Sequence, residues 1–188
     1  MSRKYKFKDQ NSIYFVTFSV IHWLDIFIRN EYKDIVLESW KYCIAEKGMD
    51  LYSWCIMTSH IHMIIASHGN RLENIMRDMK THTSKKIRDA IIHNSKESRR
   101  GWLLEMMRKA GTINSNNKDF QFWQQDNHPI KLLNAEMIHQ KLEYIHNNPV
   151  VAGIVKKPED YLYSSAGDYC GQKGLIDITL VEPAVISF

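Results

Sequence analysis

Cysteine, proline and long hydrophobic runs are all scarce in this chain of 188 residues, which holds only 3 cysteines and 4 prolines. Cys43, Cys55 and Cys170 lie far apart without paired spacing, so neither a disulfide framework nor a zinc knuckle is indicated. No apolar run approaches the roughly 18 residues of a membrane span. The basic start of the chain is not followed by the apolar stretch of a signal peptide. We therefore expect a cytoplasmic protein with no membrane partner.

A strong excess of one charge is also missing. The 25 Lys and Arg residues face 21 Asp and Glu residues, which leaves a net charge of +4. This excess permits a nucleic-acid partner but does not by itself argue for one. Hydrophobic residues make up 44% of the chain and charged residues 24%, an ordinary globular mixture, and the length suits one domain with its own core.

Hydrophobic periodicity predicts the early elements. Residues 13–20 alternate between apolar and other side chains, which is typical of a strand. Residues 30–47 carry an apolar stripe at helical spacing, and Gly48 is placed to end that helix. Residues 50–66 read as two strands or one long bent strand. Residues 70–94 read as a helix with Asn70 as its N-cap.

The second half is read in the same way. Residues 98–110 form a second basic helical segment, and residues 111–119 form a polar loop. Asn134 opens a further helix, which is expected to end near Asn148 because Pro149 disfavours helix in the residue before it. The early order of strand, helix, strand, strand and helix predicts an α+β fold with helices packed on a sheet.

A pair of histidines stands out in the apolar stretch MTSHIHMIIAS. In a strand, residues i and i+2 point to the same face, with Cα atoms roughly 6.6 Å apart. His60 and His62 would therefore project together and could share one divalent ion. A pair of satisfied histidines on a sheet surface explains this short pattern equally well.

The helix that begins at Asn134 offers partners for the histidine pair. Tyr144 and Asn148 are four residues apart and so share one helix face. An ion held by two neutral imidazoles and a neutral amide keeps nearly its full charge, which suits stabilisation of a phosphodiester transition state. The tyrosine could then attack phosphorus as a nucleophile and form a phosphotyrosine ester. Taken singly, the tyrosine is typical of a core edge and the asparagine of a helix cap.

Several stretches resemble, in the same order, those of the single-tyrosine HUH transposases, and in particular the REP-associated tyrosine transposases of the IS200-like group. MTSHIHMII at 57–65 resembles their His-hydrophobic-His strand. KLEYIHNNPVVAGIVKKPEDYLYSSAGDY at 141–169 resembles their tail segment, with its Tyr-Ile-His-x-Asn-Pro-Val, Pro-Glu-x-Tyr and Ser-Ser…Tyr blocks. FWQQDNHPI at 122–130 resembles the segment before the tyrosine helix, and YFVTFSV at 14–20 the opening strand.

The resemblance implies a single HUH-type transposase domain over residues 1–170 and a C-terminal tail over residues 171–188. It implies a ferredoxin-like antiparallel sheet with helices packed on one face. It further implies metal-dependent cleavage of single-stranded DNA through a 5′-phosphotyrosine intermediate, at hairpin-bearing ends or repeats. The expected ion is Mg²⁺ or Mn²⁺, and the expected partner is single-stranded or hairpin DNA of the bacterial nucleoid. Both a monomer and a homodimer are compatible with this class.

Roles carried over by position make His60 and His62 metal ligands, Asn148 the third ligand and Tyr144 the nucleophile. The chain departs from the family pattern in two places. Many relatives carry the longer Gln as third ligand, and Thr58 with Ser59 replace the usual Pro-Asn before the first histidine.

Basic residues after the histidine strand are candidates for DNA contacts. Lys80, Lys85 and Lys86 lie in the predicted helix over residues 70–94, and relatives tend to carry a lysine at the first of these positions. Arg99 and Arg100 could follow the phosphates of a folded hairpin. A solvated helix face is the ordinary alternative for each of them.

Two other functions remain open at this point. A ferredoxin-like sheet rich in aromatic residues can bind single strands by stacking, so the chain could be a non-catalytic binding module derived from a transposase. A metallohydrolase unrelated to DNA would need a carboxylate ligand, and no convincing partner carboxylate is evident in the sequence.

Overall fold

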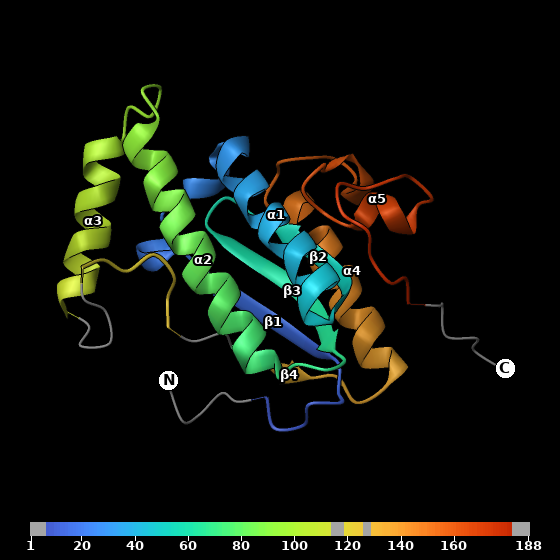
Figure 1. Ribbon diagram of the computed structural model, residues 1–188. Coiled ribbons are helices and arrows are strands. Elements are labelled where there is room, and N and C mark those ends of the chain that lie inside the picture. The colour runs from blue at the N-terminus through green and yellow to red at the C-terminus, as the bar shows by residue number, and fades with distance from the viewer. Residues whose placement is uncertain (1–6, 114–118, 126–128, 182–188) are drawn as a thin grey trace, which may run out of the picture.

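The computed structural model describes residues 7–113, 119–125 and 129–181 (Figure 1). Its centre is an antiparallel sheet with the strand order β2-β3-β1-β4. The strands are β1 (Tyr14–Ser19), β2 (Met49–Ile56), β3 (His60–Ser67) and β4 (Ile130–Lys131). The stretch predicted as two strands or one bent strand is therefore two strands, joined by a tight turn in which the Met57 amide donates to the His60 carbonyl at 2.9 Å.

The helices connect and cover these strands. The α-helices are α1 (Asn30–Lys47), α2 (Leu72–His93), α3 (Arg100–Ile113), α4 (Ala135–Val151) and α5 (Ala166–Tyr169). The short 3₁₀ turns are η1 (Ile21–Trp23), η2 (Ile26–Ile28) and η3 (Pro158–Asp160). The order β1-α1-β2-β3-α2-β4, with β1 and β2 flanking β3, is the ferredoxin-like arrangement that the sequence predicted.

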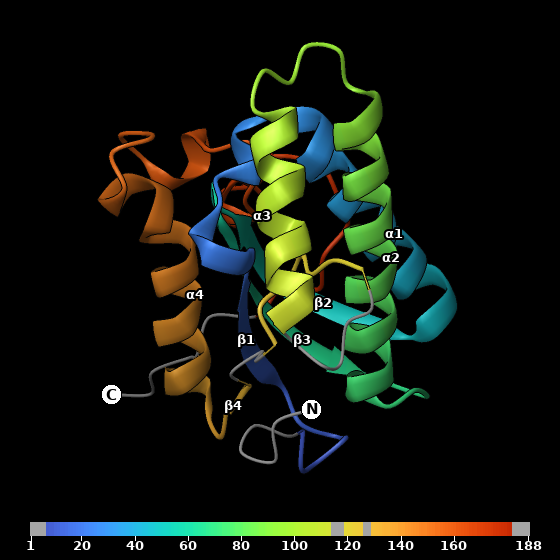
Figure 2. The same cartoon turned by 90° about the vertical axis from the view of Figure 1, so that its left-hand side faces the viewer.

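The helices form layers on both faces of the sheet. α1 and α2 lie side by side on one face, as predicted, and α3 packs against α2. α4 lies on the opposite face, where it contacts β2 and β3 (Figure 2). The predicted packing of helices on one face is confirmed by α1 and α2, and α4 adds a helix on the other face. Periodicity shows that a helix has an apolar side but not which face of the sheet receives it.

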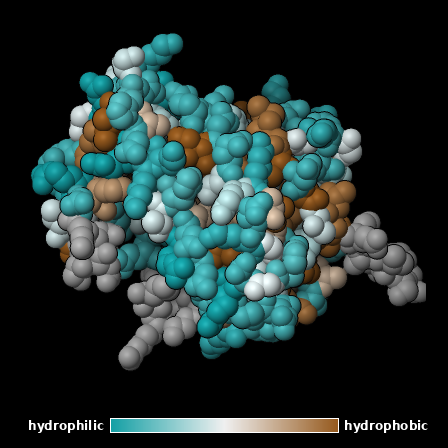
Figure 3. Space-filling model, viewed as in Figure 1, coloured by the Kyte–Doolittle hydropathy of each residue, from teal (hydrophilic) through white to brown (hydrophobic). Residues whose placement is uncertain are grey.

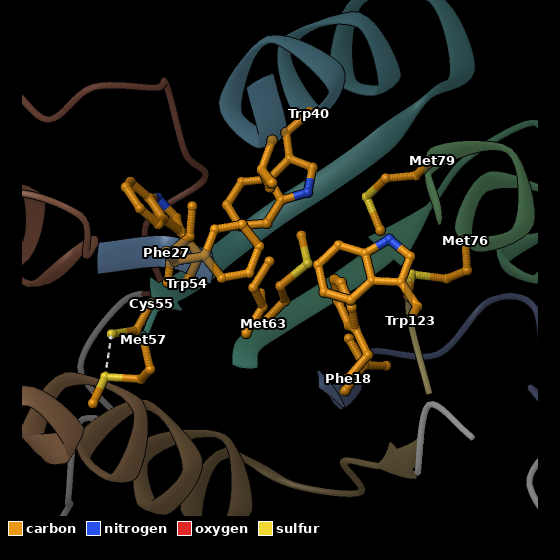
Figure 4. Close-up of a cluster of buried hydrophobic side chains, with 14 of the residues drawn as sticks. Phe18, Phe27, Trp40, Trp54, Cys55, Met57, Met63, Met76, Met79 and Trp123 are labelled. Atoms are coloured by element: carbon orange, nitrogen blue, oxygen red, sulfur yellow. Dashed lines mark hydrogen bonds between the residues drawn. The ribbon is translucent and has the colours of Figure 1, made fainter. Parts of the chain in front are cut away.

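The hydrophobic core fills the space between the sheet and the α1/α2 layer (Figure 4). Trp40 of α1 meets Trp54 of β2 edge to face, with ring centroids 5.6 Å apart. Trp123 packs against Phe18 at 4.9 Å and donates from its indole Nε1 to Thr83 Oγ1 at 3.0 Å. Burial of these large rings removes much apolar surface from water and fixes the helices on the sheet.

Helix boundaries agree with the sequence at some ends and not at others. Gly48 ends α1 in the left-handed conformation (φ 65°), and a Cβ at this position would collide with the His68 carbonyl oxygen. Asn70 is not the N-cap of α2, because its amide donates to the Lys47 carbonyl at 3.1 Å. The Gln10 side chain instead accepts from the Leu72 amide at 3.1 Å.

α4 continues through Pro149 to Val151 instead of ending near Asn148. A proline lacks only its own N–H, and here it stands in the last turn, where few intrahelical bonds remain to be lost. The Ala152 amide still donates to the Asn148 carbonyl at 2.9 Å, so the turn closes around the proline. Asn134 caps the other end as predicted, with its side chain accepting from the Met137 amide at 2.9 Å.

The segments around α3 also differ in detail from the sequence reading. α3 runs to Ile113, into the stretch predicted as polar loop, and residues 114–118 lie outside the described part. In the stretch 120–130, Trp123 forms a single β-bridge with Val20, and residues 126–128 again lie outside the described part. This segment therefore extends the sheet only locally before β4.

The stretch from Tyr161 to Ser165 covers the outer edge of β2. The Tyr161 hydroxyl donates to the Ile56 carbonyl at 2.8 Å, and the Ser165 amide donates to the Trp54 carbonyl at 3.0 Å. Further on, the Thr179 amide donates to the Leu51 carbonyl at 2.8 Å. Coverage of this kind protects a sheet edge from pairing with other chains.

The face covered by α1 and α2 is mainly hydrophilic, with hydrophobic residues in small separate groups (Figure 3). Within residues 7–113, 119–125 and 129–181, no helix has the length and hydropathy that crossing a bilayer requires.

Candidate active site

The histidine pair lies on β3 with both rings on the α4 side of the sheet. The alternation of the strand sends Ile61 and Met63 into the core between the sheet and α1/α2 and turns His60 and His62 the other way. Their ring centroids are 4.8 Å apart. His62 is buried (3% exposed) and His60 is partly exposed, so the pair forms a site that opens toward solvent at His60.

His62 is oriented by a neighbour across the strands. Thr17 of β1 pairs with His62 in register, and its Oγ1 lies 2.7 Å from Nδ1. The other ring nitrogen, Nε2, is buried and has no partner in hydrogen-bond geometry among the described residues, although the Asn148 side chain lies near enough to His62 to act on its pKa. Buried polar atoms are rarely left unpaired. When Nδ1–H donates to Thr17, Nε2 presents a lone pair, which is the arrangement typical of a metal-ligating histidine.

Both imidazoles are held in the neutral form that metal ligation needs. Burial lowers the pKa of His62 to about 3, and the charge of His60 acts in the same direction. The nearby Asn148 amide opposes this shift, and Lys141 adds to it. Burial also lowers the pKa of His60. Neutral imidazoles bind a metal ion without first releasing a proton.

α4 brings Tyr144 and Asn148 to the same place. The Tyr144 ring meets His62 edge to face at 5.3 Å and Phe15 at 5.9 Å, while remaining 49% exposed. Asn148 Nδ2 donates to the Tyr144 carbonyl at 2.6 Å, which leaves the amide oxygen Oδ1 as an acceptor or ligand. The residues predicted from two distant segments are thus neighbours in the fold.

The donor set fits a divalent ion. Two neutral imidazoles and one amide oxygen leave other coordination positions for water and phosphate oxygens. In the described part of the chain, no cluster of three or more His, Cys, Asp or Glu side chains could hold a metal. Among the described residues, the Asn148 amide is the candidate for a further ligand beside the two imidazoles. The buried, unpaired Nε2 of His62 is the structural feature that fits metal ligation.

Sequence reasoning missed two residues of this site. Thr17 was not singled out, although a polar residue within an apolar strand is a signal worth following. Lys141 was given no role, yet its Nζ lies 4.9 Å from the Phe15 ring centroid and 5.5 Å from that of Tyr144. Its position three residues before Tyr144 places it on the same helix face.

The predicted DNA-contact lysines lie apart from the histidines. Lys80, Lys85 and Lys86 stand on α2, which covers the opposite face of the sheet from α4 (Figure 2). The Lys80 ammonium donates to the Gln124 carbonyl at 2.8 Å and so holds the segment after α3. Lys85 and Lys86 are exposed. Their roles in DNA binding remain predictions.

The predicted DNA-contact arginines also have partners within the protein. Arg99 binds the buried Glu97 through Nε at 3.0 Å and the Asp25 carbonyl at 3.0 Å. Arg100 is exposed and makes one long hydrogen bond, at 3.4 Å, to the Ile92 carbonyl. The structure therefore gives Arg99 a role in packing the turn before α3, and the role of both residues in DNA binding stays a prediction.

Comparisons with known proteins identify the family. The family model described as "Transposase IS200 like" matches residues 14–119, more than half of the chain. No curated protein sequence is similar enough to count as a match.

Among solved structures, a REP-associated tyrosine transposase bound to a REP hairpin has a similar fold. Its TM-score is 0.66 at 14% identity, over 98% of this chain and 99% of that one. A candidate transposase from Deinococcus radiodurans R1 is less similar, with a TM-score of 0.44 at 14% identity over 78% of this chain and 95% of that one. The fold similarity and the family match agree, and the chain belongs to the IS200-like transposase family.

Proposed function

We propose that this transposase is a metal-dependent single-stranded DNA endonuclease and strand transferase that acts through a 5′-phosphotyrosine intermediate. The observation that carries the proposal is the meeting of His60, His62, Tyr144 and Asn148 around the unpaired Nε2 of His62. A nucleophile beside a set of neutral metal donors suits transfer of a phosphodiester to a side-chain oxygen.

The proposed metal ligands are His60, His62 and Asn148. When bound, a Mg²⁺ or Mn²⁺ ion supplies positive charge for the phosphate oxygens during the displacement. Thr17 holds the His62 ring in the ligating orientation, and the bond from Asn148 Nδ2 to the Tyr144 carbonyl fixes the amide so that Oδ1 is left for the ion.

The covalent step exchanges one ester for another. The Tyr144 hydroxyl oxygen attacks phosphorus, its proton is released, and the bond from phosphorus to the 3′ oxygen breaks. The 3′ oxygen takes up a proton and leaves as a hydroxyl group. Rejoining reverses these events when a 3′-hydroxyl attacks the phosphotyrosine ester. Lys141, beside the Tyr144 ring, adds positive charge where the phosphate must lie.

The proposed substrate is single-stranded DNA next to a hairpin, at element ends or at repeats in the bacterial nucleoid. The support is the fold shared with a transposase solved on a REP hairpin. The contact between Tyr144 and His62 within one chain supports cleavage by the residues of a single chain, whether that chain acts alone or in a homodimer.

Labelled hairpin oligonucleotides from the DNA that flanks the gene provide the test. We expect a covalent protein–DNA band on a denaturing gel with Mn²⁺, and its loss with EDTA or with Tyr144→Phe. Tyr42→Phe is the matched control, because Tyr42 is 57% exposed and lies on α1, across the sheet from α4. Binding without such a band, across several flanking sequences, would contradict the proposal and favour a non-catalytic binding module.

A further inference from the structure

Trp23 is a large exposed aromatic residue that the proposed cleavage reaction does not use. It ends η1, the turn that follows β1, and its ring meets His60 edge to face with centroids 5.3 Å apart. Its side chain is nevertheless 56% exposed. The indole therefore contacts a proposed metal ligand while much of its surface stays open to solvent. Single-stranded nucleic acids bind such surfaces by stacking bases on them.

The backbone that holds this indole is strained. His22 and Trp23 both occupy the left-handed region, with φ of 52° and 55°, and among the described residues they are the only non-glycine residues there. Bulky side chains rarely adopt this conformation, and such residues gather at functional sites. The buried Ile21 and Leu24 anchor the turn on either side. The surrounding structure thus maintains an unfavourable turn that presents the indole beside His60.

A pocket adjoins the same turn. It has a volume of about 540 Å³, and its lining includes His22, Gln124, Gln125 and the apolar Ile21. This volume lies within the range of small-ligand pockets. Side-chain amides carry a donor and an acceptor side by side, which matches the edge of a nucleobase, and the apolar wall suits the face of a base. His22 and Gln125 are exposed and can be reached by such a ligand.

The pocket and the exposed indole are formed in part by consecutive residues. His22 lines the pocket and Trp23 contacts His60, and consecutive Cα atoms are 3.8 Å apart. A single DNA strand whose phosphate lies at the histidines would contact Trp23 with one base and reach the pocket with the next. We propose that Trp23 stacks on the unpaired base beside the scissile phosphate and that the pocket receives the following base. This inference rests on the proposed function and adds the part of the substrate that the site reads.

The test measures covalent adduct formation in single turnover against DNA concentration, with the full chain, Mn²⁺ and flanking hairpin oligonucleotides. Loss of one stacked base should raise the half-saturating DNA concentration of Trp23→Ala about 10–100-fold and leave the rate at saturation nearly unchanged. Trp23→Tyr should recover most of the affinity. Trp102→Ala is the matched control, because Trp102 is 54% exposed on α3 and does not line the pocket.

A DNA variant isolates the contact itself. An abasic nucleotide beside the mapped cleavage position should weaken DNA binding by the wild-type protein as much as the substitution Trp23→Ala does. The same abasic DNA should weaken DNA binding by the Trp23→Ala protein little further. Additive losses, or an unchanged half-saturating concentration for Trp23→Ala, would overturn the stacking proposal. For the pocket, Gln125→Ala should reduce the preference for the second base, and an unaltered preference would overturn that part.

Two further measurements separate this inference from folding effects and from the proposed function. Trp23→Gly should raise thermal stability while weakening DNA binding, because glycine adopts the left-handed conformation without strain. A purely structural role would instead lower the stability of that variant. If the wild-type protein forms no adduct at all, the cleavage proposal fails, and fluorescence anisotropy with oligonucleotides carrying an abasic nucleotide at successive positions still decides whether Trp23 stacks on a base.

Discussion

Tyr144 lies edge to face against His62, with ring centroids 5.3 Å apart, although the two residues come from a helix and a strand that are far apart in the sequence. The contact places a potential nucleophile next to the buried imidazole whose Nε2 has no protein partner among the described residues. The geometry makes the function of each residue depend on the other, because neither a lone histidine pair nor a lone tyrosine would perform phosphodiester transfer.

Removal of the proposed third ligand should weaken metal binding without unfolding the protein. We expect Asn148→Ala to raise the Mn²⁺ concentration for half-maximal adduct formation about 10–100-fold, since loss of a ligating or orienting group typically has this effect. A metal titration of adduct formation measures it. Asn147→Ala is the control, because Asn147 is exposed on the same helix. An unchanged metal requirement for Asn148→Ala would exclude Asn148 as a ligand.

The Thr17 contact should tune the same metal site from a position that does not bind the ion. Thr17→Val removes the hydroxyl that lies 2.7 Å from His62 Nδ1 and keeps the branched shape. We expect roughly tenfold weaker Mn²⁺ binding by calorimetry, and recovery in Thr17→Ser. Equal metal affinity in all three proteins would show that the hydroxyl does not orient the ring.

His146 should make stability depend on pH. It is buried, and its Nε2 lies 2.9 Å from Ser165 Oγ and 3.2 Å from Ser53 Oγ. Burial lowers its pKa to about 4, from the usual value near 6.5. The unfolded chain therefore binds the proton at a higher pH than the folded chain does. The stability of the fold that depends on neutral His146 is fully present above pH 6.5 and is lost as the pH falls toward 4.

Urea unfolding across this pH range measures the His146 effect. His146→Gln should flatten part of the decline between pH 6.5 and 4, while His60 and His62, whose pKa values are also lowered, account for another part. His82→Gln controls for loss of an exposed imidazole. A His146→Gln protein with the same pH dependence as the wild type would contradict the assignment.

Glu97 should stabilise the turn that joins α2 and α3. Its carboxylate is fully buried and binds Arg29 at 2.7 Å and Arg99 at 3.0 Å. Burial alone would raise the pKa of Glu97, but hydrogen bonds from the two arginines lower it to about 2. The contribution of ionised Glu97 to folding stability is therefore present above about pH 4.5, the ordinary pKa of a glutamate. It is lost as the pH falls toward 2.

Chemical denaturation at neutral pH checks the Glu97 prediction. Glu97→Gln should lower the free energy of unfolding by about 3 kcal/mol, the lower end for a broken buried pair, because both arginines still reach solvent. Glu105→Gln breaks an exposed pair with Arg108 and should change the free energy of unfolding little. Similar losses for the two variants would mean that the Glu97 pair behaves as a surface pair.

The sequence predicted the parts of this protein that depend on local spacing. The i, i+2 pattern of His60 and His62 and the i, i+4 pattern of Tyr144 and Asn148 each defined a shared face, and both faces exist in the structure. The strand at 14–19 and the helix stopped by Gly48 also follow from periodicity and a glycine cap.

Features that depend on long-range pairing could not be predicted in this way. The register that sets Thr17 beside His62 joins two strands far apart in sequence. The partners of Lys80 and Arg99 include the carbonyls of Gln124 and Asp25, and neither is evident from the spacing of basic residues. The position of α4 on the second face of the sheet is likewise a result of tertiary packing.

The most direct test of the central claim is to identify the residue that carries DNA after cleavage. The covalent product would be digested with protease and nuclease, and the peptide that retains a nucleotide would be sequenced by mass spectrometry. We predict a nucleotide joined through its 5′ phosphate to Tyr144. A nucleotide on another residue, or cleavage that leaves no protein-linked nucleotide, would contradict the proposed mechanism.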